Sequence, residues 1–191
     1  MPYKPEKSKN PQCQTGEIFT NSDIEQIYYP NYIELNSRLQ TWLIELSEKQ
    51  EDRRLSEDYI TFFQTEKSWH SPDNLHQLEP LHELRNFIED FVFQKLGSTL
   101  RIFSMWSIIG KNGLKGKRHD HLGKVSGVYY VNNGHTDSES VTGHINFYSP
   151  DGIKKVEPLA GKLLIFPASL EHHVDAYSGT KQRIVIAFNL E

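Results

Sequence analysis

The sequence predicts a mainly β protein in which helices come first and strands follow to the end of the chain. The hydrophobic period is three to four residues in the first half and changes to two from Thr99 onward. Short strand-like segments then recur at a spacing of roughly ten residues, separated by Gly, Pro and Asn. This order argues against a doubly wound α/β fold, which would alternate helices and strands. It favours a closed or two-sheet β architecture.

Two helix-like patterns precede the strands. Residues 31–50 place apolar side chains at three- and four-residue spacing, which predicts an amphipathic helix. Residues 80–96 form the clearer pattern, with Pro80 at its start and Gly97 just past its end. Ahead of the first helix, residues 17–29 are predicted to form one or two short strands.

A polar stretch separates the two predicted helices. Residues 48–58 are a charge run, which is typical of a solvated face or loop. Residues 68–75 are predicted to form a loop with one large aromatic side chain, Trp69. Two interpretations of Trp69 stay open: it walls a functional site, or it anchors a surface loop to the core.

The second half is predicted to be a series of strands, because apolar runs alternate there with turn residues. The predicted strands are residues 100–109, 125–131, 144–148, 153–156, 162–166, 173–177 and 183–190. Neither an internal repeat nor a second domain boundary interrupts the chain. We therefore expect a flexible arm at 1–14 and a single domain at 15–191, with helical elements at about 31–97 and barrel strands at about 99–191.

Composition excludes several classes of protein. A net charge of −4 gives no general electrostatic case for nucleic-acid binding. The single cysteine, Cys13, excludes an internal disulfide framework and a CxxC zinc site. No apolar run approaches the roughly 20 residues of a membrane span, and no signal-peptide pattern opens the chain. We therefore expect a cytoplasmic protein, in a reducing environment.

Two histidines, His119 and His121, stand two residues apart just before the predicted strand at 125–131. On an extended segment they point to the same face, with Asp120 on the opposite face. Two imidazoles aimed at one point make a metal clamp if a third ligand arrives from elsewhere in the chain. The candidate third ligand is His172, and its neighbour His173 is the rival.

These histidines belong to a longer pattern: His119-x-His121, then Ser-Gly-Val-Tyr-Tyr at 126–130, then Leu-Glu-His-His-Val at 170–174, then Arg183. The ordered set resembles the iron(II)- and 2-oxoglutarate-dependent oxygenase superfamily. Within it, the chain is similar to the small bacterial and phage-type oxygenases with the pattern H-x-H…SGVYY…LEH-x-V…R. The resemblance covers most of the chain and is far more specific than a lone H-x-H.

The resemblance implies a double-stranded β-helix, a cupin-like jelly roll, with the N-terminal helices packed on one sheet. It implies iron(II) held by His119, His121 and His172, since the LEH-x-V pattern of the family places the distal ligand at this last position. It also implies that Arg183 grips the distal carboxylate of 2-oxoglutarate with two parallel hydrogen bonds. Tyr130 is expected to contact the same carboxylate, because its strand resembles that of prolyl hydroxylases.

Two residues depart from the commonest pattern of the superfamily. His121 stands where a carboxylate is usual, and Val185 stands where a serine or threonine usually adds a hydrogen bond to the co-substrate. Three-histidine iron centres also occur in cupin dioxygenases that do not use 2-oxoglutarate. The alternative hypothesis is therefore a cupin-like metal-binding protein, either non-catalytic or a three-histidine dioxygenase independent of 2-oxoglutarate. Trp106 and Asn112 are further candidates for the walls of the site.

The leading hypothesis is a non-haem iron(II)- and 2-oxoglutarate-dependent dioxygenase, an oxidoreductase that hydroxylates its substrate and releases succinate and CO2. Its cofactors would be iron(II) and 2-oxoglutarate, with ascorbate as a stimulant. The expected partner is a peptide side chain such as proline, or a small metabolite, and neither nucleic acid nor a membrane. An outer helix or a long strand could also form a homodimer.

Overall fold

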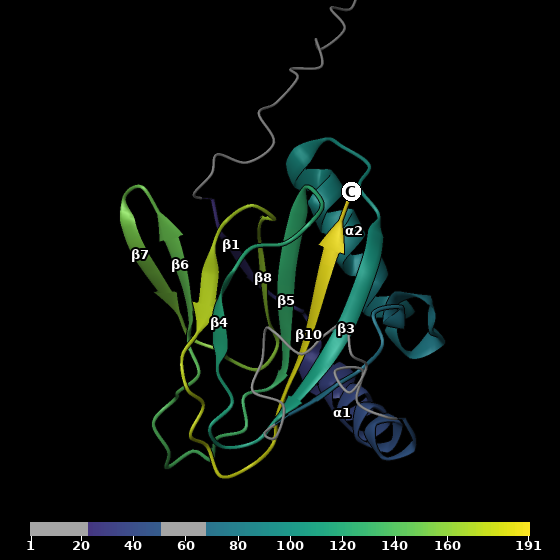
Figure 1. Cartoon of the computed structure of the whole chain (residues 1–191). Coiled ribbons are helices and arrows are strands. Elements are labelled where there is room, and N and C mark those ends of the chain that lie inside the picture. The colour runs from purple at the N-terminus through teal and green to yellow at the C-terminus, as the bar shows by residue number, and fades with distance from the viewer. Residues whose placement is uncertain (1–22, 51–67) are drawn as a thin grey trace, which may run out of the picture.

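Two antiparallel β-sheets face each other in the computed structural model, which describes residues 23–50 and 68–191 (Figure 1). The large sheet comprises, in spatial order, β1 (Glu25–Tyr28), β8 (Lys162–Pro167), β5 (Val125–Asn132), β10 (Arg183–Leu190), β3 (Ile102–Gly110) and β2 (Ser68–His70). The small sheet comprises β4 (Gly116–His119), β9 (His172–Val174), β6 (Ile145–Ser149) and β7 (Gly152–Val156). This architecture confirms the mainly β, two-sheet fold predicted from the sequence.

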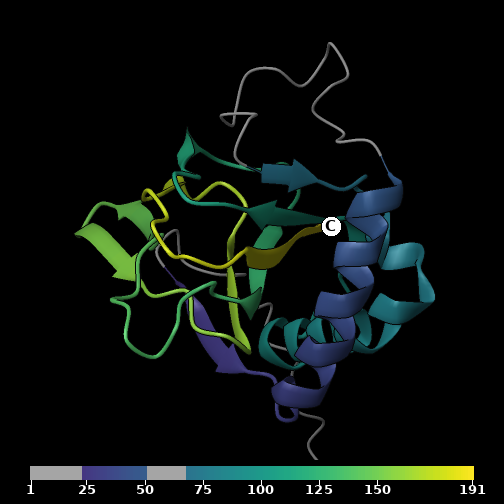
Figure 2. The same ribbon diagram turned by 90° about the horizontal axis from the view of Figure 1, so that it is seen from below.

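Two helices cover the face of the large sheet that points away from the small sheet (Figure 2). They are α1 (Tyr32–Lys49) and α2 (His82–Leu96), the latter preceded by the short 3-10 helices η4 (Leu75–Gln77) and η5 (Glu79–Leu81). α1 buries Leu35, Leu39 and Leu43 at the four-residue spacing of one helical face. α2 ends at Gly97, whose φ of 62° is a left-handed conformation that glycine adopts without steric cost. Both predicted helices are confirmed.

Alternation along the strands of the large sheet sorts its side chains into two cores. On the helix side, Ile186 and Phe188 of β10 and Tyr129 of β5 belong to the larger apolar cluster. On the side of the small sheet, Tyr130 and Val185 belong to a second cluster with residues of β6 and β8. The second set of side chains therefore lines the space between the two sheets, where a site would lie.

A buried polar contact holds α1 on the strand that carries Tyr130. The Asn36 side-chain amide donates to the carbonyl of Val131 at 2.8 Å, and the Tyr129 hydroxyl donates to Asn36 Oδ1 at 2.6 Å. Buried hydrogen bonds fix how two elements pack, because a shift of either element would leave buried polar groups without partners. The contact fixes β5 on its helix side while Tyr130, the next residue, faces the opposite side.

Two elements differ from the sequence-based expectations. Residues 68–75 were expected to be a loop, but Ser68–His70 forms β2 and pairs with the end of β3. Trp69 packs against the helix-side core and donates its indole N–H to the carbonyl of Gln50, so it anchors this segment and does not wall the space between the sheets. The strand expected at 173–177 is β9, which is shorter and begins one residue earlier, at His172.

Some expectations fall on residues outside the two described ranges. These are the arm at 1–14, residues 17–22 of the predicted strand region and residues 51–58 of the charge run. Within the described ranges, no helix combines the length and the apolar character that a membrane span requires.

Candidate metal centre and anion pocket

Three histidines from distant parts of the chain converge between the two sheets. His119 is the last residue of β4, His121 follows in the next loop, and His172 is the first residue of β9. β4 and β9 are paired so that His119 lies directly opposite His172. One ligand nitrogen from each imidazole lies within 4.8 Å of the other two, a spacing that could hold a metal ion. The structure therefore brings together all three predicted metal ligands.

Backbone carbonyls orient two of these rings. His119 Nδ1 lies 2.7 Å from the carbonyl of Lys117, and His172 Nδ1 lies 2.9 Å from the carbonyl of Leu170. A carbonyl can only accept, so each Nδ1 carries a proton, and Nε2 is the nitrogen that can ligate a metal when the ring is neutral. Such contacts set the tautomer of metal-binding histidines. His121 Nε2 and His172 Nε2 approach each other to 3.3 Å.

Burial keeps two of the imidazoles neutral. It lowers the pKa of His121 to about 3, and the neighbouring His172 and His119 lower it further in the same direction. Burial, followed by the charge of His119, lowers the pKa of His172 to about 4. Metal ligation requires the neutral form of imidazole, so near pH 7 these rings are ready to bind without losing a proton. A donor set of three imidazoles suits divalent iron and its neighbours in the first transition row.

His173 points to the outer face of the small sheet. Its Nδ1 accepts from the Tyr148 hydroxyl at 2.9 Å, and its Nε2 donates to the Asp175 carboxylate at 3.1 Å. Lys155 of β7 approaches Asp175 at 2.9 Å, and the Arg118 guanidinium stacks 3.8 Å from the Tyr148 ring centroid. His173 therefore belongs to a polar ladder across all four strands of the small sheet, and the structure does not bring it to the centre formed by the three other histidines.

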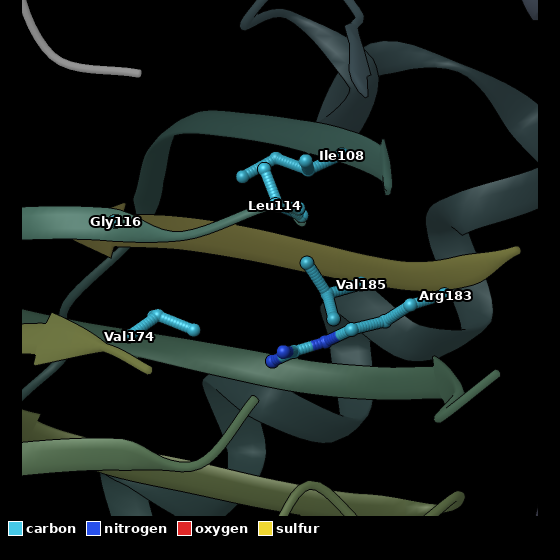
Figure 3. A pocket seen from close by; sticks show the side chains of 6 residues that line it. All are labelled: Ile108, Leu114, Gly116, Val174, Arg183 and Val185. Carbon is cyan, nitrogen blue, oxygen red and sulfur yellow. The ribbon is translucent and has the colours of Figure 1, made fainter. Parts of the chain in front are cut away.

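Arg183 occupies the same inter-sheet space as the histidines, at the start of β10. Its side chain extends into a cavity of about 40 Å³ whose walls are otherwise apolar (Figure 3). The lining residues are Ile108, Leu114, Gly116, Val174, Arg183 and Val185. By this measure one water needs roughly 10–15 Å³, so the cavity exceeds a single-water hole.

The Arg183 guanidinium is buried without an acidic partner in the described part of the chain. It is only 3% exposed, and Nη1 donates to the carbonyl of Gly143 at 2.7 Å, but Nε has no hydrogen-bond partner. Burial lowers the pKa of Arg183, while nearby Tyr130 and Tyr177 oppose that shift. A buried, incompletely satisfied cation is costly, so the pocket is suited to an anionic ligand.

Tyr130 lies beside this guanidinium. The Tyr130 ring centroid is 5.6 Å from the centre of the Arg183 guanidinium. Burial raises the pKa of Tyr130 to about 12, and Arg183 opposes the rise. The phenol is therefore protonated near pH 7 and can act as a hydrogen-bond donor to an anion in the pocket. Val185 contributes only an apolar wall to the cavity, so no hydroxyl is supplied from that position.

Gly143 is a supporting residue that the sequence did not reveal. Its carbonyl holds Arg183, and its φ of 71° disfavours any side chain. A Cβ built at this position would lie 2.3 Å from Arg183 Nη1. The position therefore requires glycine both for backbone conformation and for space. A single glycine in a loop gave no signal of this role, because the contact joins residues 40 positions apart.

A partly exposed stripe of the large sheet faces the metal ligands. Trp106 lies on this stripe, and its ring centroid is 5.9 Å from that of His121, so the tryptophan walls the centre. Ala187 pairs with Trp106 on one side and with Val128 on the other, which places all three on one face. Asn112 is exposed in the turn between β3 and β4 and does not line the cavity.

The segment that carries these residues matches a known protein family. Residues 104–189 match the profile described as "Putative 2OG-Fe(II) oxygenase", where 2OG denotes 2-oxoglutarate. This segment is therefore similar to members of that family. The matched segment runs from β3 to β10 and contains the three histidines and Arg183. The profile describes oxygenases that use iron(II) and 2-oxoglutarate, so the match makes these two ligands the ones to test against the site.

Solved structures share the fold at low sequence identity. A prolyl-4-hydroxylase from Pseudomonas putida has a TM-score of 0.63 and 15% identity, over 87% of this chain and 91% of that one. A prolyl hydroxylase from Trichoplax adhaerens, in complex with a hypoxia inducible factor oxygen degradation domain peptide fragment, has a TM-score of 0.62 and 16% identity, over 89% of this chain and 84% of that one. The non-heme alpha ketoglutarate dependent epimerase SnoN from nogalamycin biosynthesis has a TM-score of 0.66 and 13% identity, over 87% of this chain and 77% of that one.

These likenesses assign the two sheets to the double-stranded β-helix that was predicted, with its sheets antiparallel and not closed on each other. No curated protein matches this sequence. The donor set and the pocket fit iron(II) and 2-oxoglutarate. Three imidazoles meet at one point, and a buried guanidinium with an N–H that has no hydrogen-bond partner lies in an apolar cavity.

Proposed function

We propose that the protein is a 2-oxoglutarate-dependent hydroxylase in which His119, His121 and His172 bind iron(II) and Arg183 binds the distal carboxylate of 2-oxoglutarate. The observation that carries the proposal is the joint placement of both parts in one inter-sheet space. A dicarboxylate that chelates the metal at one end needs a cation at its other end, and Arg183 supplies it. Bound iron(II) would couple O2 and the decarboxylation of 2-oxoglutarate to hydroxylation, releasing succinate and CO2.

The protein's own groups have separate tasks in this proposal. Carbonyls hold the Nδ1 protons of His119 and His172, so Nε2 is the nitrogen that each ring offers to a metal. The unused Nε–H of Arg183 and one further guanidinium N–H can donate in parallel to a carboxylate. Tyr130 can add a third donor from its protonated phenol. The apolar lining of the cavity excludes water, which strengthens each of these charged contacts.

The experiment is an assay for succinate formed from 2-oxoglutarate in the presence of iron(II) and ascorbate, without added substrate. Slow uncoupled turnover is expected in the parent protein and none above background in His119→Ala and His172→Ala. His173→Ala serves as the matched control, since it removes an imidazole from the adjacent position on the outer face. Absence of 2-oxoglutarate consumption by a protein that contains stoichiometric iron would reject the proposal.

One observation favours a second candidate function, a three-histidine centre that does not use 2-oxoglutarate. All three grouped ligands are histidines, so the site adds no negative charge to balance iron(II). The visible spectrum of the anaerobic iron(II) protein separates the two candidates. Chelation by 2-oxoglutarate produces a charge-transfer band, and the second candidate predicts an unchanged spectrum at saturating 2-oxoglutarate.

The substrate is proposed to be a peptide side chain, with a small metabolite as the other option. The Trichoplax adhaerens neighbour was solved with a peptide fragment, and its fold covers 89% of this chain. The partly exposed stripe that includes Trp106 leaves one wall of the metal centre accessible from outside. A homodimer through an outer helix or strand remains a separate proposal, which the mass of the protein in solution would test.

A further inference from the structure

Cationic side chains gather on the segment that delivers the metal ligands. Residues 111–124 contain five of them, against one acidic side chain, Asp120. The segment thus carries a net +4, which leaves −8 for the rest of a chain whose total is −4. All five cationic residues are exposed: Lys111, Lys115, Lys117, Arg118 and Lys124. A local charge of this sign, opposite to that of the whole chain, points to a local anionic partner.

Most of this positive charge is not neutralised within the described part of the chain. Arg118 is an exception, because it pairs with Glu171 and stacks on Tyr148. Lys111, Lys115 and Lys124 form no salt bridge with any described residue. Two of these lysines flank β4 and its histidine loop together: Lys115 directly precedes the strand, and Lys124 follows the loop, directly before β5.

β4 also has an open backbone edge. It is the outer strand of the small sheet and pairs only with β9 among the described strands. An exposed edge can accept an extended peptide as an additional strand, through main-chain hydrogen bonds. The four residues of β4 span about 13 Å at the usual rise per residue, which exceeds the reach of most small metabolites. Lys115 and Lys124, which flank β4 and its histidine loop, are therefore better placed to contact an extended chain than a compact molecule.

An apolar patch lies at the metal end of this edge. Leu122 directly follows His121 and is 82% exposed, and Phe103 of β3 is 39% exposed. Gly123, the neighbour of Leu122, lies against Phe103, since a Cβ at Gly123 would be 3.0 Å from the Phe103 ring. Trp106, also on β3, packs beside His121, the residue before Leu122. A partner on this surface would meet positive charge along β4 and apolar side chains beside the metal ligands.

We propose that the β4 edge and the 120–124 loop bind an extended acidic peptide segment that carries an apolar residue beside the side chain to be oxidised. This inference rests on the proposed function for the role of the peptide as substrate. A peptide is favoured over nucleic acid because its backbone complements the strand edge. The −8 charge of the remaining chain would also repel a long polyanion that extends past this short strip.

The test measures the fluorescence anisotropy of a short labelled peptide, rich in Glu with one central Leu, as the protein is added. The same peptide with Gln in place of Glu is the charge control, and an oligodeoxythymidylate of equal charge is the nucleic-acid control. The acidic peptide should bind with higher affinity than either control, and its affinity should fall as the salt concentration is raised. Equal binding of the Gln peptide, or tighter binding of the oligonucleotide, would overturn the proposal.

Paired variants locate the surface. Lys115→Ser with Lys124→Ser should weaken peptide binding about threefold to tenfold at low salt, as expected for two exposed charge contacts. Lys154→Ser with Lys181→Ser removes the same charge from exposed positions outside the segment and should leave binding unchanged. An equal loss of peptide affinity in the two double variants would show that net charge alone is responsible and would refute the proposed site.

The binding assay needs neither iron nor turnover, so it stays informative even if the protein forms no succinate. That outcome would reject the proposed function while leaving the peptide surface intact. In the iron-loaded protein, the acidic peptide should raise succinate formation above the uncoupled rate. Binding of the peptide without such a rise, in a protein that does show uncoupled turnover, would overturn its role as substrate.

Discussion

The two faces of the small sheet carry adjacent histidines with opposite surroundings. His172 faces inward, is 4% exposed and meets two other imidazoles, with burial lowering its pKa to about 4. His173 faces outward and is satisfied by Tyr148 and Asp175. Consecutive residues of a strand point to opposite faces, so one residue of register decides which ring is available to a metal. The comparison shows that a polar ladder and a metal centre can share the same strand.

The first prediction compares the removal of one imidazole from each face of the small sheet. His172→Ala should abolish iron binding and succinate formation, since loss of a ligand exceeds the roughly 10–100-fold effect of altering its supporting shell. His173→Ala should retain stoichiometric iron and lose only stability. Iron content by atomic absorption, together with succinate yield, measures the contrast. A His173→Ala protein as poor in iron as His172→Ala would contradict the assignment of the two faces.

A second substitution on the inner side, at Arg183, should weaken binding of 2-oxoglutarate without affecting binding of iron. Arg183→Gln is expected to raise the KM for 2-oxoglutarate by about 10–100-fold, because a charge-assisted contact inside the cavity is removed. Iron binding should stay at the parent level, since Arg183 is not among the grouped metal ligands. Pyruvate, which lacks the distal carboxylate, is the matched control ligand. Its weak affinity should be the same in both proteins, and a selective loss of pyruvate binding would count against this role of Arg183.

Substitution of two glycines with positive φ distinguishes the effect of backbone strain from the effect of displacing Arg183. Gly143→Ala meets Arg183 Nη1 at 2.3 Å, whereas Gly152→Ala in the outer hairpin meets nothing within 4 Å. Each change should cost about 1 kcal/mol of unfolding free energy from backbone strain. Only Gly143→Ala should also weaken 2-oxoglutarate binding, by about tenfold. Urea denaturation and 2-oxoglutarate titration of both variants test the difference, and an equal effect on titration would refute it.

The buried imidazoles predict how the stability of the metal-free protein depends on pH. The pKa is 6.5 when unperturbed but about 3 for His121 and about 4 for His172 in the fold. Between these values the unfolded chain binds more protons than the folded one, so unfolding free energy should rise from about pH 4 to pH 6.5. The slope is at most about 1.4 kcal/mol per pH unit for each histidine.

Variants at His172 and His173 test whether the inward-facing histidine contributes to the slope of unfolding free energy against pH. His172→Phe should flatten the dependence of unfolding free energy on pH between about 4 and 6.5, because one group no longer changes protonation on unfolding. His173→Phe should retain the parent slope. Urea titrations at a series of pH values, with a chelator present, provide the measurement. The same slope in the parent protein and in His172→Phe would exclude this explanation.

The outer ladder predicts the smallest effect. Tyr148→Phe removes the hydroxyl that hydrogen-bonds His173 but keeps the ring on which Arg118 stacks. The expected loss is about 0.5–1.5 kcal/mol of unfolding free energy, with iron content and the KM for 2-oxoglutarate unchanged. A marked fall in iron affinity would show that the outer face contributes to the metal centre after all.

Local periodicity explains which parts of the fold were predictable. The helices at 32–49 and 82–96 and the strands at 125–132 and 183–190 follow from apolar spacing, because each pattern is complete within one segment. β2 and β9 were misjudged, since three-residue strands are too short for a period and exist only through their partners β3, β4 and β6. Trp69 was ambiguous for the same reason: either core can receive an aromatic side chain, and pairing with β3 decided which.

The sequence by itself determined the identities and spacing of the ligands: two imidazoles at alternate positions, a third about fifty residues later, and an arginine opening the last strand. Only the tertiary structure decided that His119 lies opposite His172, that Gly143 holds Arg183, and that the cationic segment borders an open strand edge. The physical reason is that these contacts join residues far apart in the chain. Their register depends on how two sheets pack, and no local preference specifies it.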